Sequence, residues 1–453
     1  MKPAKRIAVV GANAAGLAAA SRAKRRDPAA AVVVLEAGSV PSVSNCNFAY
    51  VLSGRLDDPA RVVAHPPEYF SKGRGLDLRL ESPVVEVQPA RRLLRVAPRE
   101  AAPYELSYDR LVYTAGALAR RLEIPGRDAG GVFALHSYDD LVEAHLYLQE
   151  RRPRRIAVVG CGFKGLGAAC ALAQRGEVAL VCAADNPLGL APSVAARLNK
   201  HLEKLGITVQ RGARVNGYLH GRDGRLVAVE TDAGRLEAEA ALELVGVIPN
   251  LVPLGDRLKT ERSSGALVVD ARQETSVDGV FAAGDCATVR HALRSGRFHL
   301  PNGAYANRAG RTAGANAAGD AEKTTPVLGT RATELHGFEL SRTGLDPAQA
   351  AAAGYDTTLV EIRVLPHATF HKPRTYLDCA AVVERPTGRL LGVQLAGEYG
   401  ANHRINSAAT VIHAGMSVGE AARLDYAYHP AASPVWDPLL VLFRAAEKEL
   451  ALG

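Results

Sequence analysis

The fold is decided by the stretch KRIAVVGANAAG at residues 5–16. Its apolar run leads into a glycine turn and then an alanine-rich segment, residues 17–26, which predicts a strand, a tight turn and a helix. A second apolar run, AVVVL, follows and ends at Glu36. The helix N-terminus of such a βαβ unit offers N–H groups to a pyrophosphate, and a carboxylate after the second strand can accept hydrogen bonds from a ribose diol. The stretch therefore predicts a dinucleotide site.

The same design recurs at residues 154–182, where RRIAVVGCGFKG begins a second strand, glycine turn and helix. We expect this helix to reach Gln174 and VALVC to form the next strand. Two copies of the unit predict an α/β protein with two Rossmann-like dinucleotide-binding domains.

A further strand-to-turn segment, GVFAAGD at 279–285, delivers Asp285 on a glycine turn. A carboxylate there suits the ribityl and pyrophosphate region of a flavin dinucleotide. Together with the turn that begins at Gly11, it predicts that the bound dinucleotide is FAD. The segment YDRLVYTAGA at 108–117 is another strand that closes on a turn of small residues.

From Pro326 onward the pattern changes to alternating strands and one helix near residues 408–415, which predicts an α+β unit. We expect three domains in all. They are an FAD-binding domain (1–119 and 254–325), an NAD(P)-binding-like domain (120–253) and a C-terminal domain (326–453).

Composition excludes several classes of protein. Hydrophobic residues make up 47% and charged residues 23% of 453 residues, which is typical of soluble globular chains. No apolar run reaches the ~20 residues of a membrane span, and the N-terminus runs into a strand without a cleavage-like site, so we expect a cytoplasmic protein. The net charge of +8 lacks the aromatic interleaving of nucleic-acid binders. The six cysteines form no CxxC pair, which argues against a disulfide scaffold and a zinc site.

The chain resembles the single-cysteine pyridine nucleotide-disulfide oxidoreductases, and within them the CoA-disulfide and NAD(P)H persulfide reductases most closely. The matching pieces span nearly the whole chain in the family order. They are VVGANAAG, Ser42-x-x-Asn45-Cys46, YTAG, LEIPG, VGVIPN, TSVDGVFAAGDCA, SRTGL, VIHAGMSVGEAARLD and, with Tyr428, SPVWDPL. The resemblance implies a glutathione-reductase-like fold whose C-terminal α+β domain forms a homodimer.

Cys46 is the redox centre that this resemblance implies, with its sulfur beside the flavin. A helix N-terminus and an oxidised flavin both favour a thiolate there. We interpret the remaining cysteines as small, buried, unreactive side chains. They are Cys161, Cys170, Cys182, Cys286 and Cys379.

The resemblance also implies which residues hold each partner. FAD is expected at Gly11, Ala14, Ala15, Gly16, Glu36, Ala115, Gly116 and Asp285, and NAD(P)H at Gly160, Gly162 and Gly165. A small thiol, disulfide or persulfide, with CoA as the model, is expected at Arg22, Lys24, Arg25, Ser42 and Asn45. The predicted catalytic residues are Cys46, Tyr428, His371 and Lys164, and we predict no metal ligand.

Three of these positions carry further expectations from the family. Oxidases and peroxidases carry a histidine where this chain has Ala14, which speaks against peroxide or dioxygen as the main acceptor. Tyr428 is expected to reach the sulfur site of the other subunit as a proton donor. His371 stands near an expected second tyrosine, and is either a proton donor or a surface loop histidine.

The second glycine turn departs from the family. Phe163 replaces a tyrosine, Lys164 an aliphatic residue, Gly167 a glutamate and Cys182 the acid that holds the NADH ribose. Lys164 either stabilises an anion beside the flavin or extends to solvent.

Four functions follow from these observations. The leading hypothesis is a reductase that passes electrons from NAD(P)H through FAD to Cys46 and a small disulfide or persulfide. The departures at the second turn favour a nicotinamide-independent flavin and cysteine enzyme as the alternative. A redox sensor lacks an added interaction module to support it, and an oxidase or peroxidase is disfavoured by Ala14.

Overall fold

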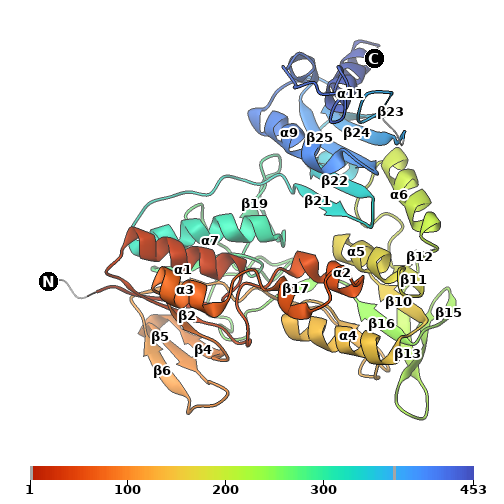
Figure 1. Ribbon diagram of the computed structural model, residues 1–453. Helices are drawn as coiled ribbons and strands as arrows, with labels where there is room; N and C mark the ends of the chain where they lie inside the picture. Colours follow the sequence, from red (N-terminus) through yellow and green to blue (C-terminus); the bar gives the residue numbers. More distant parts are fainter. Residues whose placement is uncertain (1–3, 371–373, 453) are drawn as a thin grey trace.

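The first apolar run forms β1 at the middle of a parallel sheet with strand order β18-β7-β1-β2-β3 (Figure 1). The computed structural model describes residues 4–370 and 374–452. Ile7 and Val9 of β1 face helices α1, α3 and α7, whereas Ala8 and Val10 face an antiparallel sheet, β4-β5-β6. Because both faces are covered, the strand is apolar throughout. The strands are β1 Arg6–Val10, β2 Ala31–Leu35, β3 Asp77–Arg79, β4 Val84–Gln88, β5 Leu93–Val96, β6 Tyr104–Ser107, β7 Arg110–Tyr113 and β18 Val280–Ala282.

Helices α1 and α7 pack against each other backbone to backbone. A Cβ atom on Gly310 would overlap the backbone of Ala15, and one on Gly314 would overlap the backbone of Ala19. This contact holds the residues just before α7 against the start of α1. The helices of this unit are α1 Ala14–Arg26, α2 Phe48–Leu52, α3 Pro67–Arg74 and α7 Gly303–Ala318, with short 3-10 turns η1 Asn45–Asn47, η2 Pro59–Val62 and η3 Pro89–Arg91.

The second βαβ unit builds a separate parallel sheet, β12-β11-β10-β16-β9. In it β10 lies between β11 and β16, with Val159 beside Val181. Strands β13, β14 and β15 form an antiparallel sheet beside it, and β17 pairs with β8 where the chain crosses between the units. The elements are β8 Ala117–Ala119, β9 Val132–Ala134, α4 Tyr138–Arg151, β10 Arg155–Val159, α5 Phe163–Leu172, β11 Glu177–Cys182, α6 Pro192–Lys204, β12 Thr208–Arg211, β13 Val215–His220, β14 Leu226–Thr231, β15 Gly234–Glu237, β16 Ala240–Glu243 and β17 Val247–Pro249.

The C-terminal unit is an antiparallel sheet, β21-β22-β25-β24-β23, with α9 and α11 packed in its core. It stands above the other two units in Figure 1. The remaining elements are β19 Val289–Arg290, β20 Arg297–Phe298, β21 Arg331–Glu334, β22 Glu339–Gly344, α8 Pro347–Ala352, β23 Thr357–Val364, β24 Leu377–Glu384, β25 Leu390–Gly397, α9 Ala401–Ala414, α10 Val418–Ala421 and α11 Pro438–Leu452.

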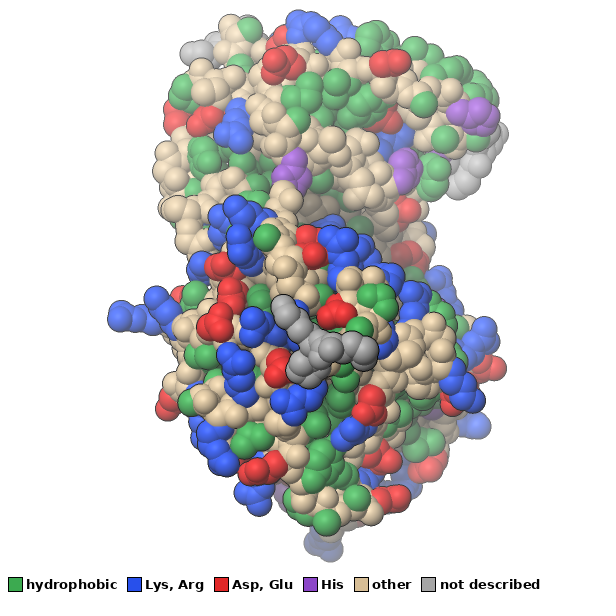
Figure 2. Space-filling view, turned by 90° about the vertical axis from the view of Figure 1, so that its left-hand side faces the viewer, with side chains coloured by type: hydrophobic (Ala, Val, Ile, Leu, Met, Phe, Trp, Pro, Cys, Tyr) green, Lys and Arg blue, Asp and Glu red, His purple; other side chains and the backbone are tan. Residues whose placement is uncertain are grey.

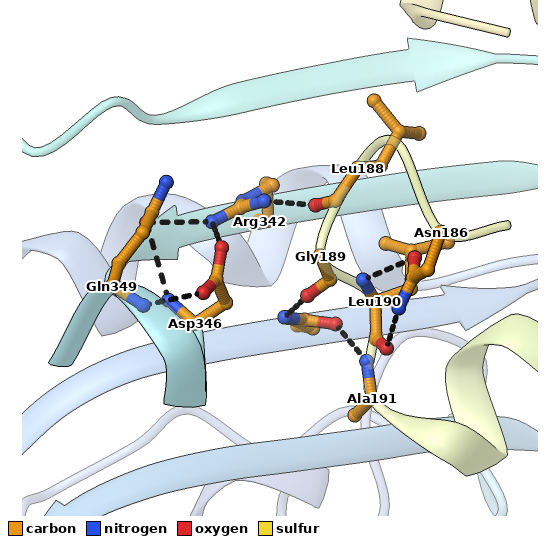
Figure 3. Close-up of polar contacts among 9 residues, drawn as sticks. Asn186, Leu188, Gly189, Leu190, Ala191, Arg342, Asp346 and Gln349 are labelled. Carbon is orange, nitrogen blue, oxygen red and sulfur yellow. Dashed lines mark hydrogen bonds and ion pairs between the residues drawn. The ribbon is translucent and has the colours of Figure 1, made fainter. Parts of the chain in front are cut away.

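The loop that follows β11 is anchored on the C-terminal unit (Figure 3). The Gln394 amide donates to the Gly189 carbonyl at 2.8 Å and accepts from the Ala191 N–H at 2.7 Å. Arg342 donates to the Leu188 carbonyl and pairs with Asp346 at 3.2 Å. Since Gln394 and Asp346 are both buried, these bonds fix the loop against the third sheet.

The predicted fold class is confirmed by these sheets. Two helices begin earlier than the sequence suggested: α1 at Ala14 rather than 17, and α9 at Ala401 rather than near 408. The first residues of α1 are small, and those of α9 are mostly polar, so neither start shows an apolar stripe. The boundaries of the three predicted domains remain predictions. Over residues 4–370 and 374–452, no helix is long and apolar enough to cross a membrane.

The α1–α7 contact predicts a stability difference between two Gly→Ala substitutions. Gly314→Ala forces α7 away from α1 and should lower the free energy of unfolding by about 1–3 kcal/mol. Gly73→Ala in α3 places its methyl group in open space and should leave stability unchanged or raised by up to about 1 kcal/mol. Urea unfolding of both variants measures this. Equal midpoints would contradict backbone contact between the helices.

Candidate active site

A large cavity, about 1940 Å³, is lined by residues of all three units. Its wall includes the start of α1, the segment around Cys46, the second glycine turn, the turn before α7 and one side of α9. Figure 2 shows Lys and Arg side chains gathered about the hollow between the C-terminal unit and the rest. Because drug-sized pockets usually hold 300–1,000 Å³, this volume has room for a dinucleotide together with a substrate.

The first glycine turn has the geometry that a pyrophosphate needs. Gly11 has φ +98°, and a Cβ atom on Gly16 would overlap the Gly11 carbonyl, so the turn closes tightly on α1. The Glu36 carboxylate accepts from the N–H groups of Ala12 at 2.6 Å and Gly38 at 2.9 Å. Carboxylate oxygens have further lone pairs, so Glu36 can still accept from ribose hydroxyls. These residues fit FAD.

Asp285 lines the cavity beside the start of α1 and near the N-terminus of α7, where Gly284 lies against Ala15. Its carboxylate accepts from the Asn302 N–H at 3.2 Å, and its carbonyl accepts from the His299 ring at 2.8 Å. Asn302 caps α7 by accepting from Ala304 and Tyr305. Helix N-terminus and polar side chains therefore meet where a flavin's ribityl and phosphate groups would need them.

Cys46 lies in η1, lines the cavity and is a free, exposed thiol. The turn before it is strained, because Ser42 has φ +59°, a left-handed conformation that non-glycine residues rarely adopt. The Ser42 N–H donates to the Ala12 carbonyl at 2.9 Å, which ties the cysteine segment to the first glycine turn. The Asn45 amide donates to the His136 carbonyl at 2.6 Å and so fixes the other side.

Lys164, in the first turn of α5, points into the same cavity. Its ammonium lies 3.3 Å from Nδ1 of His136. Burial in the cavity lowers the pKa of Lys164, although the charges of Asp285 and Cys46 oppose that shift. Burial, and then the charge of Lys164, lower the pKa of His136. Both shifts disfavour the charged forms of this pair, and the Lys164 side chain lies within electrostatic range of Cys46.

Arg331 is a functional candidate that the sequence did not reveal. It lines the cavity at the start of β21, stacks over the Phe163 ring at 5.8 Å and donates to the Pro301 carbonyl at 2.9 Å. Burial lowers its pKa, while the charges of Asp285 and Cys46 oppose that shift. No local motif marks this arginine, since it reaches the site only through the packing of the third unit.

Three arginines, which we call the arginine cluster, line one part of the cavity: Arg25, Arg74 and Arg311. Burial, then repulsion from Arg311 and Arg74, lower the pKa of Arg25. Of the three basic α1 residues predicted to bind substrate, only Arg25 lines the cavity among the described residues. Arg22 pairs with Glu322, and Lys24 donates to the Ala30 carbonyl at 2.8 Å. Arg74 and Arg311 come from α3 and α7, so their grouping with Arg25 had no sequence signal.

The second glycine turn keeps its tight form but corrects one prediction. Gly160 has φ +108°, and a Cβ atom on Gly165 would overlap the Gly160 carbonyl. Cys161 and Cys182, predicted to be unreactive buried side chains, are buried but joined in a disulfide with Cα atoms 5.4 Å apart. They follow β10 and end β11, and neighbouring parallel strands bring their carboxyl ends together. The sequence separation of 21 hid this pairing.

The remaining predicted residues are placed as follows. Ala14, Ala15, Gly162 and Asp285 line the cavity. Ala115 and Gly116 follow β7, where their carbonyls accept from Asn250. Tyr428 is 54% exposed and does not line the cavity of its own chain. His371 lies outside the described residues. Among those that are described, no group of three His, Cys, Asp or Glu side chains could hold a metal ion.

Comparison with known proteins identifies the architecture. The profile "Pyridine nucleotide-disulphide oxidoreductase" matches residues 5–310, and the dimerisation domain of that family matches residues 333–438. The chain belongs to this family. The predicted resemblance is thereby confirmed, and the protein is an FAD-dependent oxidoreductase.

Three relatives carry named activities. An NAD(P)H coenzyme A polysulfide/persulfide reductase of Pyrococcus horikoshii is 33% identical over 97% of this chain and 98% of its own. An NADH oxidase of Methanocaldococcus jannaschii is 27% identical over 98% of this chain and 99% of its own. The structure of an NAD-dependent persulfide reductase from A. fulgidus has a TM-score of 0.93 at 28% identity, over 98% of this chain and 83% of the other.

Proposed function

We propose that the protein uses NAD(P)H to reduce a CoA-type disulfide or persulfide at Cys46. This proposal rests on which residues line the cavity. Among the described residues, Cys46 is the one cysteine that lines it, and the arginine cluster lines the same space. A reactive sulfur and a phosphate-binding surface in one cavity suit a thiol that carries phosphates.

Cys46 supplies the sulfur chemistry. Its thiolate attacks one sulfur of the substrate, a mixed disulfide forms, and the other sulfur leaves as a thiolate or hydrosulfide. Lys164 is the proton donor to that leaving group, with His136 as its hydrogen-bond partner at 3.3 Å. Lys164 and Arg331 also stabilise negative charge on sulfur, since both lie within electrostatic range of Cys46.

The first glycine turn, Glu36 and Asp285 would hold FAD. When bound, the flavin would pass an electron pair from the nicotinamide nucleotide to the mixed disulfide. The strained Ser42 and the Asn45–His136 bond orient the Cys46 segment toward that part of the cavity.

The nicotinamide nucleotide would bind at Gly160, Gly162 and Gly165. Neither Gly167 nor the disulfide-bonded Cys182 offers a carboxylate to it. This observation favours a second candidate, a flavin and cysteine enzyme that takes its electrons from a thiol. Stopped-flow spectra distinguish the two: NADH or NADPH bleaches the flavin in the first case and leaves it oxidised at millimolar nucleotide in the second.

Lys164 predicts a pH dependence. Because its pKa is lowered, the ammonium loses its proton at a lower pH than an ordinary lysine, and turnover with CoA disulfide should fall as pH rises through that point. Lys164→Arg keeps the positive charge but does not release its proton, so turnover should fall and the alkaline limb due to Lys164 should be lost. Lys164→Met should lower turnover about 100-fold and flatten the profile. Identical alkaline limbs in the wild type and Lys164→Arg would remove Lys164 from the reaction.

The arginine cluster predicts substrate discrimination. Arg74→Gln and Arg311→Gln should each raise KM for CoA disulfide about ten-fold, because each removes a charged contact to phosphate worth about 1.5–3 kcal/mol. KM for cystine, which lacks phosphates, should stay unchanged. Arg91→Gln, an exposed residue outside the cavity, is the matched control. Equal effects on both substrates would show that the cluster does not select CoA.

We infer that the active unit is a homodimer. Residues 333–438 match a dimerisation domain, and this region exposes Tyr428, Val435 and Trp436, at 54%, 68% and 54%. Exposed apolar side chains of this size support a protein interface. Tyr428 would then serve the cavity of the neighbouring subunit.

Subunit mixing tests this arrangement. Homodimers of Cys46→Ser and of Tyr428→Phe should both have low activity. For Tyr428→Phe the activity should be about 100-fold below that of the wild type. Heterodimers formed from the two variants contain one site with both native residues, so activity should recover toward half of the wild-type value. Mixed preparations that stay inactive after verified heterodimer formation would place Tyr428 in its own subunit's site, and full activity of the Tyr428→Phe homodimer would remove Tyr428 from the reaction.

A further inference from the structure

The Cys161–Cys182 disulfide lies directly beneath the second glycine turn. Cys161 is the residue between Gly160 and Gly162, the N-cap of α5, and Cys182 is the last residue of β11. The two side chains are 7% and 1% exposed and belong to the packed core of this unit. The bond therefore joins the turn that approaches a pyrophosphate to the end of the neighbouring strand.

The two ends of this bond are held by different contacts. The loop after Cys182 is held on the C-terminal sheet through Gln394 and Arg342, as Figure 3 shows. The turn around Cys161 is held by the Gly160 N–H, which donates to the Val181 carbonyl at 2.9 Å, and by its continuity with α5. Because the strand end is also tied to a second unit, a change at the sulfurs would fall mainly on the turn.

Reduction changes the space that the two sulfurs need. Bonded sulfurs lie about 2.05 Å apart, whereas non-bonded heavy atoms prefer about 3.5–4.0 Å. The surrounding core is close-packed, so it cannot absorb this expansion without movement. Since the contacts of a pyrophosphate to a glycine turn depend on the position of its backbone N–H groups, displacement of the turn weakens them.

We propose that Cys161 and Cys182 form a second, reversible redox centre, separate from Cys46, whose disulfide state holds the turn in its nucleotide-binding form. Its oxidant is a small disulfide, RSSR. The Cys161 thiolate attacks one sulfur, the S–S bond of RSSR breaks, and one RS⁻ leaves. The Cys182 thiolate then displaces the second RS⁻, so two electrons pass to the small disulfide and the protons of both cysteines end on the two released thiols.

The consequence is that oxidised small thiols switch on nucleotide binding. Disulfides in reducing compartments are commonly redox-sensing, which agrees with a bond placed at a binding turn. This inference rests on the proposed function, in which a nicotinamide nucleotide is the electron donor. It gives small disulfides, the class of compound that reacts at Cys46, a second and regulatory role at Cys161 and Cys182.

The test measures nucleotide affinity in both states of the holoenzyme. Alkylation under denaturing conditions should label four of the six cysteines before reduction and all six after treatment of the native enzyme with excess thiol. Calorimetry with NAD⁺ and NADP⁺, in a Cys46→Ser background that silences the flavin-side thiol, should show about ten-fold weaker binding after reduction. Re-oxidation with glutathione disulfide should restore the affinity.

Three variants separate the redox role from a packing role. Cys161→Ser and Cys182→Ser should both bind nucleotide weakly and should no longer respond to thiol or disulfide. Cys170→Ala removes a buried free thiol in the same domain and should keep the wild-type response. Retained redox response in either single variant would overturn the proposal.

Other outcomes also overturn it. They are labelling of all six cysteines without reductant, a bond that excess thiol leaves intact in the native enzyme, equal affinities in both states, and nucleotide binding in neither state. Only the last also bears on the proposed function. That function is tested independently, by re-oxidation of dithionite-reduced enzyme with CoA disulfide, which requires no nucleotide.

Discussion

Helices α1 and α7 touch through their backbones, and the site depends on this contact. The start of α1 carries the first glycine turn, while the residues before α7 carry Asp285 and Asn302. Because Gly310 and Gly314 leave no side chain between the helices, the start of α1 and the residues that precede α7 are held at a fixed separation. Both glycine turns use the same device, since Gly16 and Gly165 each lie directly on a carbonyl of their own turn. Binding surfaces made of bare backbone can thus face one large cavity.

Each of the three units contributes basic side chains to the cavity. The first unit supplies the cysteine and the arginine cluster, the second supplies Lys164 and His136, and the third supplies Arg331. Burial is the main reason why the pKa values of Lys164, His136 and Arg331 are lowered. The basic side chains that the three units contribute suit the cavity to anionic substrates.

Much of the architecture could be predicted from local patterns, and much of the site could not. Strand, turn and helix follow one another within about 30 residues in each βαβ unit, so KRIAVVGANAAG and RRIAVVGCGFKG were sufficient to predict them. Residues such as His136, Arg331 and the arginines of α3 and α7 meet only because separate units pack together. The disulfide was missed for a related reason. Its cysteines are distant in the chain and adjacent only across two parallel strands.

The carboxylate of Glu36 is engaged by the backbone of its own domain, and this links cofactor selection to folding. One of its partners, the N–H of Ala12, belongs to a residue that is 1% exposed, so loss of the carboxylate leaves a buried donor unpaired at a cost of about 1–3 kcal/mol. A substitution of Glu36 that adapts the site to a different ligand would therefore also lower the free energy of unfolding. Change at this position of the first domain is thereby restrained by folding, and in the second domain the corresponding residue, Cys182, is tied to its own glycine turn by the disulfide with Cys161 instead.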